Sequence, residues 1–180
     1  MKSIAKYLAT ALFCAIVVGG SALAQTVNID YDHTVNFMKF KTYTWAHVHA
    51  TDPAVENRIT IAFNRDMASR YMTETQTGGD VTISAVEVTS DKQEYTDFYN
   101  GISNLTWQRG WGSGGFMEGQ ASLQDLQIGS LVIDMYDTKT QKIIWRGVVA
   151  EPVANGVLNV LKVDKAVTQL ITKYPPKFSK

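Results

Sequence analysis

Apolar and polar residues alternate in several short stretches of the chain, which is the pattern of half-buried β-strands. Residues 27–31 place Val27, Ile29 and Tyr31 on one side and polar residues on the other. Residues 42–45 (TYTW) and residues 80–89 (DVTISAVEVT) are rich in β-branched and aromatic side chains, which favour strands. We therefore expect one strand in each of these three stretches.

A longer apolar spacing in residues 53–71 predicts the first helix. Asp52 is a suitable N-cap, and Pro53 fits the first helical position. The apolar positions that keep helical spacing are Val55, Ile59, Ala62, Phe63, Met67 and Tyr71. Gly78 and Gly79 follow, and because glycine disfavours a helix, the segment that contains the helix ends there.

A second helix is predicted from about Val157 to Lys173. Its apolar stripe consists of Val157, Val160, Leu161, Val163, Val167, Leu170 and Ile171. Pro175 ends the helix, because proline lacks an amide hydrogen and its ring clashes with the preceding turn.

Strands grouped around two helices predict an α+β fold. We expect a two-layer domain in which a mixed, mainly antiparallel sheet is packed by two long helices. Only the connection that contains the first helix is long enough to join parallel strands. Residues 25–180 show no repeat or linker and are interpreted as a single domain.

The stretch GSLVIDMYDTKTQKIIWRG, residues 129–147, has the pattern of a hairpin. Its turn is a four-residue loop, Thr138 to Gln141, in which Asp137 caps the turn and faces Lys142. Continuing that register pairs Met135 with Ile144, Asp134 with Trp145, Ile133 with Arg146 and Val132 with Gly147.

Three residues of the hairpin are interpreted as structural: Asp134, Asp137 and Trp145. Two catalytic carboxylates must converge on one substrate. Asp134 and Asp137 point to opposite faces of the strand, so the pair is not a catalytic dyad. We expect Asp134 to be held by the Trp145 indole or by Arg146, because an unpaired buried carboxylate is costly.

Residues 1–24 have the pattern of a secretory signal peptide. Lys2 and Lys6 precede an apolar run, and Ala22-Leu23-Ala24 predicts cleavage before Gln25. Cys14 is the only cysteine and follows Phe13, which argues against lipidation. We expect a periplasmic or secreted protein whose mature chain has no transmembrane segment, because no later apolar run reaches about 20 residues.

Charge and motifs narrow the function classes further. Removal of Lys2 and Lys6 leaves 15 basic and 17 acidic residues, so nucleic acid is not an expected partner. No serine stands in a G-x-S-x-G motif, and the glycine-rich GWGSGG lacks the Lys-Ser/Thr of a phosphate loop. We predict no cofactor.

An aromatic, glycine-rich segment between about Ser90 and Gln120 is the strongest binding candidate. Its rings are Tyr95, Phe98, Tyr99, Trp107, Trp111 and Phe116. Such rings dominate interface energetics and stack on sugars or peptides. The segment therefore predicts binding of an envelope protein or glycan, chiefly through Tyr95, Tyr99, Trp107, Trp111 and Phe116. The alternative is that some rings fold back onto the core.

A second functional hypothesis uses Asp30, Asp32 and the three histidines, His33, His47 and His49. Imidazole and carboxylate are ligands of zinc and similar ions. If these side chains converged in one pocket, the protein would be a small hydrolase or metal-dependent enzyme. The bland alternative is that the histidines are solvated at a strand end, and no metal site is predicted.

The motifs VNIDYDHTVNFMKFKTYTW and GSLVIDMYDTKTQKIIWRG, with the closing helix that ends in YPP, resemble the domain of unknown function 4136 family. The resemblance spans essentially the whole mature chain, although Gln141 stands where a turn glycine is common. It implies an uncharacterised exported protein of the bacterial envelope and supplies no catalytic residues. With the aromatic segment, it favours a non-enzymatic binding or structural module.

Overall fold

The computed structural model describes residues 26–88, 128–150 and 160–174. Nine elements lie in these ranges. They are β1 (Thr26–Tyr31), the 3-10 helix η1 (Phe37–Lys39), β2 (Thr42–His49), α2 (Pro53–Ala68), β3 (Thr73–Glu74), β4 (Val81–Glu87), β5 (Leu131–Asp137), β6 (Lys142–Ala150) and α4 (Val160–Thr172).

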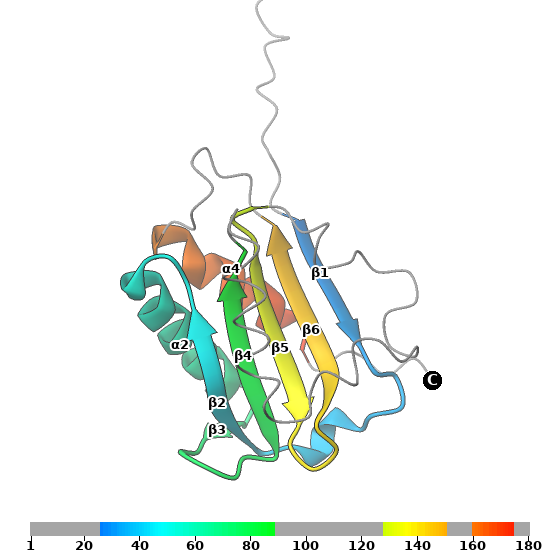
Figure 1. The fold of residues 1–180 in the computed structure, drawn as a ribbon. Helices are drawn as coiled ribbons and strands as arrows, with labels where there is room; N and C mark the ends of the chain where they lie inside the picture. The colour runs from blue at the N-terminus through cyan, green and yellow to red at the C-terminus, as the bar shows by residue number, and fades with distance from the viewer. Residues whose placement is uncertain (1–25, 89–127, 151–159, 175–180) are drawn as a thin grey trace, which may run out of the picture.

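The strands form one mixed sheet in the order β1-β6-β5-β4-β2-β3. The β1–β6, β6–β5 and β5–β4 pairs are antiparallel, whereas β4–β2 and β2–β3 are parallel. The parallel pair β2–β4 is joined through α2, as the length of that connection predicted. The described residues therefore have an α+β fold, with a six-stranded mixed sheet and two α-helices (Figure 1).

Both helices lie behind the sheet in Figure 1 and run in the same direction. Three contacts show that direction: Arg58 pairs with Asp164, the Arg65 guanidinium donates to Thr168 Oγ1 over 3.0 Å, and the Arg70 guanidinium donates to the Thr172 carbonyl over 3.0 Å. The residue numbers of the partners increase in the same order along both segments, so α2, with the turn that follows it, runs parallel to α4. The Arg70 contact also satisfies a carbonyl at the end of α4, where intrahelical partners run out.

The core lies between the helices and the sheet. From α2 it contains Val55, Ile59, Ala62, Phe63 and Met67, as their spacing predicted. The cap of α2 is also confirmed, because the Asp52 side chain accepts a hydrogen bond from the Ala54 amide over 2.8 Å. Trp145 is fully buried, and its ring meets Tyr174 edge-to-face with centroids 5.9 Å apart.

Two residues of the predicted apolar stripes do not belong to the core. Tyr71 lies beyond the end of α2 and is 87% exposed, and Leu161 on α4 is 88% exposed. Helical spacing alone cannot detect that α2 stops at Ala68, where the chain turns back toward β3. The predicted start of the last helix at Val157 lies outside the described residues.

The hairpin turn spans Thr138 to Gln141 as predicted, but the predicted register beyond it is wrong. Asp137 faces Lys142 and Tyr136 faces Ile143; then a bulge makes Met135 face Trp145 and Asp134 face Arg146. The extra residue, Ile144, lets two successive apolar side chains, Ile144 and Trp145, both reach the core. A register counted from the turn assumes strict alternation and misses this shift.

Within the described residues, no helix is long and apolar enough to cross a membrane.

Candidate functional site

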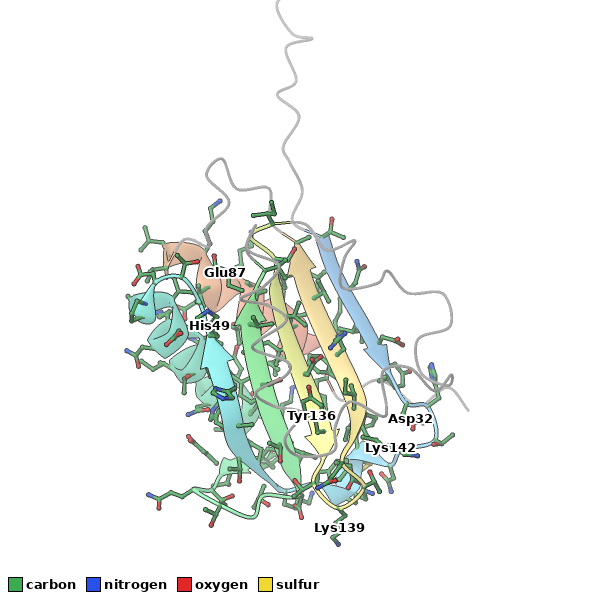
Figure 2. All side chains as sticks on the ribbon, viewed as in Figure 1. Asp32, His49, Glu87, Tyr136, Lys139 and Lys142 are labelled. Carbon is green, nitrogen blue, oxygen red and sulfur yellow. The ribbon has the colours of Figure 1, made fainter. Side chains whose placement is uncertain are left out.

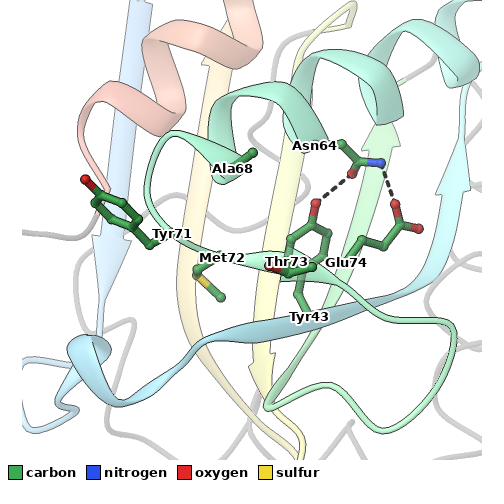
Figure 3. A pocket seen from close by; sticks show the side chains of 7 residues that line it. All are labelled: Tyr43, Asn64, Ala68, Tyr71, Met72, Thr73 and Glu74. Atoms are coloured by element: carbon green, nitrogen blue, oxygen red, sulfur yellow. Dashed lines mark hydrogen bonds between the residues drawn. The ribbon is translucent and has the colours of Figure 1, made fainter.

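A surface pocket of about 430 Å³ lies where the end of α2 meets the edge strand β3 (Figure 3). Its walls come from β2, α2 and the connection that leads into β3. The lining residues are Tyr43, Asn64, Ala68, Tyr71, Met72, Thr73 and Glu74. One of the seven is acidic and none is basic, so the lining has a negative charge.

Asn64 on α2 organises the polar side of the pocket. Its Oδ1 accepts hydrogen bonds from the Tyr43 hydroxyl over 2.9 Å and from the Trp45 indole over 3.0 Å. Two donors at one oxygen fix the orientation of the amide. Its Nδ2 therefore faces Glu74 and donates to Oε2 over 2.6 Å (Figure 3).

The hydroxyl of Tyr43 is a permanent donor in this network. Burial, and then the nearby Glu74 carboxylate, raise the pKa of Tyr43 well above its usual range. The phenol therefore stays protonated at physiological pH and holds Asn64 in place. Glu74 itself is exposed, and within the described ranges its second oxygen, Oε1, has no hydrogen-bond partner.

Tyr71 stands at the other end of the pocket in an unusual backbone conformation. Its φ is +60°, in the left-handed region. The Met72 amide donates to the Met67 carbonyl over 3.1 Å and the Tyr71 amide to the Ala68 carbonyl over 3.0 Å. This pair of bonds is a Schellman motif, and Tyr71 occupies the position that glycine usually takes.

Tyr71 thus has neither a favourable backbone conformation nor a buried side chain. A left-handed conformation costs an L-residue about 1–2 kcal/mol, and the ring recovers little by packing because it is 87% exposed. Stability does not explain a tyrosine at this position. Residues held in such conformations cluster at binding and catalytic sites, which makes the pocket the candidate site.

The structure places Asp134 in a row of side chains on the sheet face opposite the one that α2 and α4 pack against. The register puts Asp30, Arg146, Asp134 and Ser84 side by side across β1, β6, β5 and β4. Arg146 donates from Nε and Nη2 to the two oxygens of Asp134, and both donor–acceptor distances are 2.5 Å. Both carboxylate oxygens of Asp134 are thereby occupied by a buried ion pair.

Of the two donors expected for Asp134, Arg146 is the partner, and the Trp145 indole is not. Trp145 faces the core, and within the part of the chain that the structure describes its Nε1 has no hydrogen-bond partner. The bulge explains the difference, because it turns Trp145 away from Asp134.

Asp137 caps the hairpin turn. Its Oδ1 accepts from the amides of Lys139 over 2.9 Å and Thr140 over 3.0 Å, and Lys39 lies 3.4 Å from Oδ2. Burial alone would raise the pKa of Asp137, but these hydrogen bonds and the Lys39 charge lower it below its usual range. The carboxylate is thus held ionised as part of the turn.

The residues of the hydrolase or metal hypothesis are not brought together. Asp32 accepts from the amide and hydroxyl of Thr34 in the turn after β1. His47 and His49 lie on β2, four strand positions from β1, or roughly 19 Å at about 4.8 Å a step. Figure 2 shows Asp32 toward one edge of the sheet and His49 toward the other.

Asp30 and His33 stay near β1. The Asp30 Oδ1 accepts from the Tyr31 amide over 2.9 Å, and burial raises the pKa of Asp30. The His33 ring lies against Tyr31, with centroids 4.2 Å apart. Among the described residues, no three His, Cys, Asp or Glu side chains are grouped so as to hold a metal ion.

The aromatic segment lies outside the described residues, and so do its candidates Tyr95, Tyr99, Trp107, Trp111 and Phe116. Their role in binding stays a prediction.

Sequence reasoning missed Asn64 and Glu74 and assigned Tyr71 to the helix. A tyrosine four positions after Met67 fits the helical period, so spacing conceals the helix end. The available signal was the run of polar residues from Thr73 to Thr77, which interrupts the apolar pattern. It marks a boundary, but it does not show that Asn64 and Glu74 meet.

Comparison with solved structures finds a protein with a similar fold. A crystal structure of a PDZ domain protein from Parabacteroides distasonis matches with a TM-score of 0.53 and 12% identity, covering 94% of this chain and 40% of that one. The chain therefore spans well under half of that protein, and at this identity the likeness concerns the fold alone.

Two structures of a PelC dodecamer from Paraburkholderia phytofirmans match this chain with lower TM-scores. Their TM-scores are 0.44 and 0.46 at 7% and 5% identity; each match covers 83% of this chain and 95% or 96% of that chain. No curated protein gives a significant match.

A match to a family model assigns the chain to a protein family. It matches residues 27–176, which include every described element except Thr26 at the start of β1. The chain belongs to the family described as domain of unknown function DUF4136.

Proposed function

We propose that this protein is an exported, non-enzymatic binding module of the bacterial cell envelope, and that the pocket between α2 and β3 binds its ligand. The signal-peptide pattern of residues 1–24 supports export to the periplasm or medium. The single observation that carries the binding role is Tyr71, a strained and exposed aromatic residue beside the pocket.

The contacts that the acidic residues make support the non-enzymatic part of the proposal. Asp134 is occupied by Arg146, while Asp137 and Asp32 cap turns. Asp30 lies far from His47 and His49 across the sheet. No specific observation therefore favours the hydrolase or metal-dependent alternative.

Binding through the aromatic segment is a second part of the proposal. If Trp107 and Trp111 form a platform, replacing both with alanine should weaken retention on envelope material while changing the unfolding free energy by less than about 0.5 kcal/mol. A large loss of stability with unchanged binding per folded molecule would show instead that the rings pack on the core.

Retention of the purified mature protein on envelope fractions of the producing bacterium tests the pocket. Tyr71→Gly should reduce retention, because the ring is lost. Leu161→Ala is a matched control, since it removes an equally exposed apolar side chain on α4 that does not line the pocket. Retention of Tyr71→Gly at the wild-type level, at equal folded concentration, would refute a binding role for the pocket.

Export is tested separately by the intact mass of the protein recovered from periplasm or medium. The expected mature N-terminus is Gln25. A diacylglyceryl group on Cys14, or an uncleaved chain confined to the cytoplasm, would overturn this part of the proposal.

A further inference from the structure

From the chemistry of the pocket we infer that its ligand is an extended peptide segment that carries a lysine or arginine side chain and lies along the open edge of β3. This inference rests on the proposed binding function and names its ligand class. It is drawn from Glu74, Tyr71 and the β3 backbone.

The exposed Glu74 carboxylate can accept a further hydrogen bond, and a cation fits it best. Asn64 already donates to Oε2, and it is fixed from behind by Tyr43 and Trp45. Within the described ranges Oε1 has no hydrogen-bond partner, and no basic residue lines the pocket. Since an ionised carboxylate only accepts, and charged donors bind it more strongly than neutral ones, the pocket selects a protonated amine or guanidinium.

The remaining walls suit the stem of a basic side chain. Ala68 and Met72 contribute apolar surface, and the Tyr71 ring stands exposed at the end opposite Glu74 (Figure 3). Lysine and arginine bury their methylene stems on apolar surface while the charged head stays with polar partners. Because the Tyr71 ring lies opposite Glu74, it can contact the stem or the peptide backbone of the ligand, not its charged head.

The backbone of β3 points to a peptide and not to a free amine. The Thr73 amide donates to the carbonyl of Lys41, just before β2, at 2.9 Å, and the Thr75 amide donates to the Tyr43 carbonyl of β2 at 2.8 Å. In a parallel ladder the residue between them, Glu74, turns its own N–H and C=O away from β2. Among the described strands β3 is the last one of the sheet, and both of its residues are exposed. These groups therefore face an edge where an extended peptide can add main-chain hydrogen bonds.

Isothermal titration of the mature protein with three probes tests the inference. The probes are the capped peptide acetyl-Ala-Lys-Ala-amide, its neutral counterpart acetyl-Ala-Gln-Ala-amide, and n-butylamine. We expect the lysine peptide to bind at least about tenfold more tightly than either of the others, as a charge-assisted bond and the backbone contacts imply. Glu74→Gln should remove the preference for lysine over glutamine, and Leu161→Ala should leave it unchanged.

Three results would overturn the inference: equal binding of both peptides, equal binding of butylamine and the lysine peptide, or no binding of the lysine peptide. A fourth is a lysine preference that survives Glu74→Gln. If Tyr71→Gly still weakens retention on envelope material, such a result removes only the ligand class. If it does not, the proposed function fails as well.

Discussion

Replacing Tyr71 with alanine and, separately, with glycine separates the cost of its backbone from the contribution of its ring. Both variants remove the aromatic ring. Only glycine relieves the left-handed conformation, because it has no Cβ to clash at φ +60°. Comparing the two variants with each other cancels the small packing contribution of a ring that is 87% exposed.

Glycine usually makes a protein less stable than alanine at the same position, and here we expect the reverse. Relief of the left-handed strain is worth about 1–2 kcal/mol, and the greater freedom of glycine in the unfolded chain costs about 0.5–1 kcal/mol. Tyr71→Gly should therefore be about 0.5–1 kcal/mol more stable than Tyr71→Ala. For a domain of this size that difference corresponds to about 1–4 °C in Tm.

Chemical denaturation followed by tryptophan fluorescence measures the difference. The matched control is Ala68→Gly at the last residue of α2, where the backbone is helical and glycine should destabilise by roughly 0.5–1 kcal/mol. If Tyr71→Ala were as stable as Tyr71→Gly, or more stable, the left-handed strain would be absent. Tyr71 would then carry no strain for a binding role to explain.

Three further predictions concern the sheet. Gly147→Ala should destabilise by about 1–3 kcal/mol, because an added Cβ would lie 2.4 Å from the Trp145 ring and 2.7 Å from a Leu170 methyl; an unchanged urea midpoint would contradict this packing. Trp145→Ala should cost about 3–5 kcal/mol and Asp137→Asn far less, since one leaves a cavity and the other keeps a turn cap; equal losses in urea would show that the roles are misassigned. Hydrogen bonds from the Lys41 and Thr42 amides lower the pKa of Asp80, so its stabilisation is present above the unfolded pKa of about 3.9 and is lost as pH falls through the lower folded pKa. The stability gap between wild type and Asp80→Asn should therefore close in acid, and a gap independent of pH would exclude that carboxylate as the cause.

The chain itself determined its elements wherever one local rule dominates. Asp52 and Pro53 specify the start of α2, because capping and proline geometry involve only neighbouring residues. The turn from Thr138 to Gln141 is local in the same sense, and Asp137 caps it from within. The α+β class followed from the order of strands and helices.

Tertiary structure decided everything that depends on which residues meet across the fold. The bulge at Ile144 exists because the core takes both Ile144 and Trp145, and a residue count from the turn contains no information about the core. Similarly, Asn64 and Glu74 are ten residues apart and meet only because the chain reverses at Tyr71 to add β3 beside β2. Periodicity reports the face on which a side chain lies, whereas a binding site depends on contacts between elements, and those are fixed only when the layers pack.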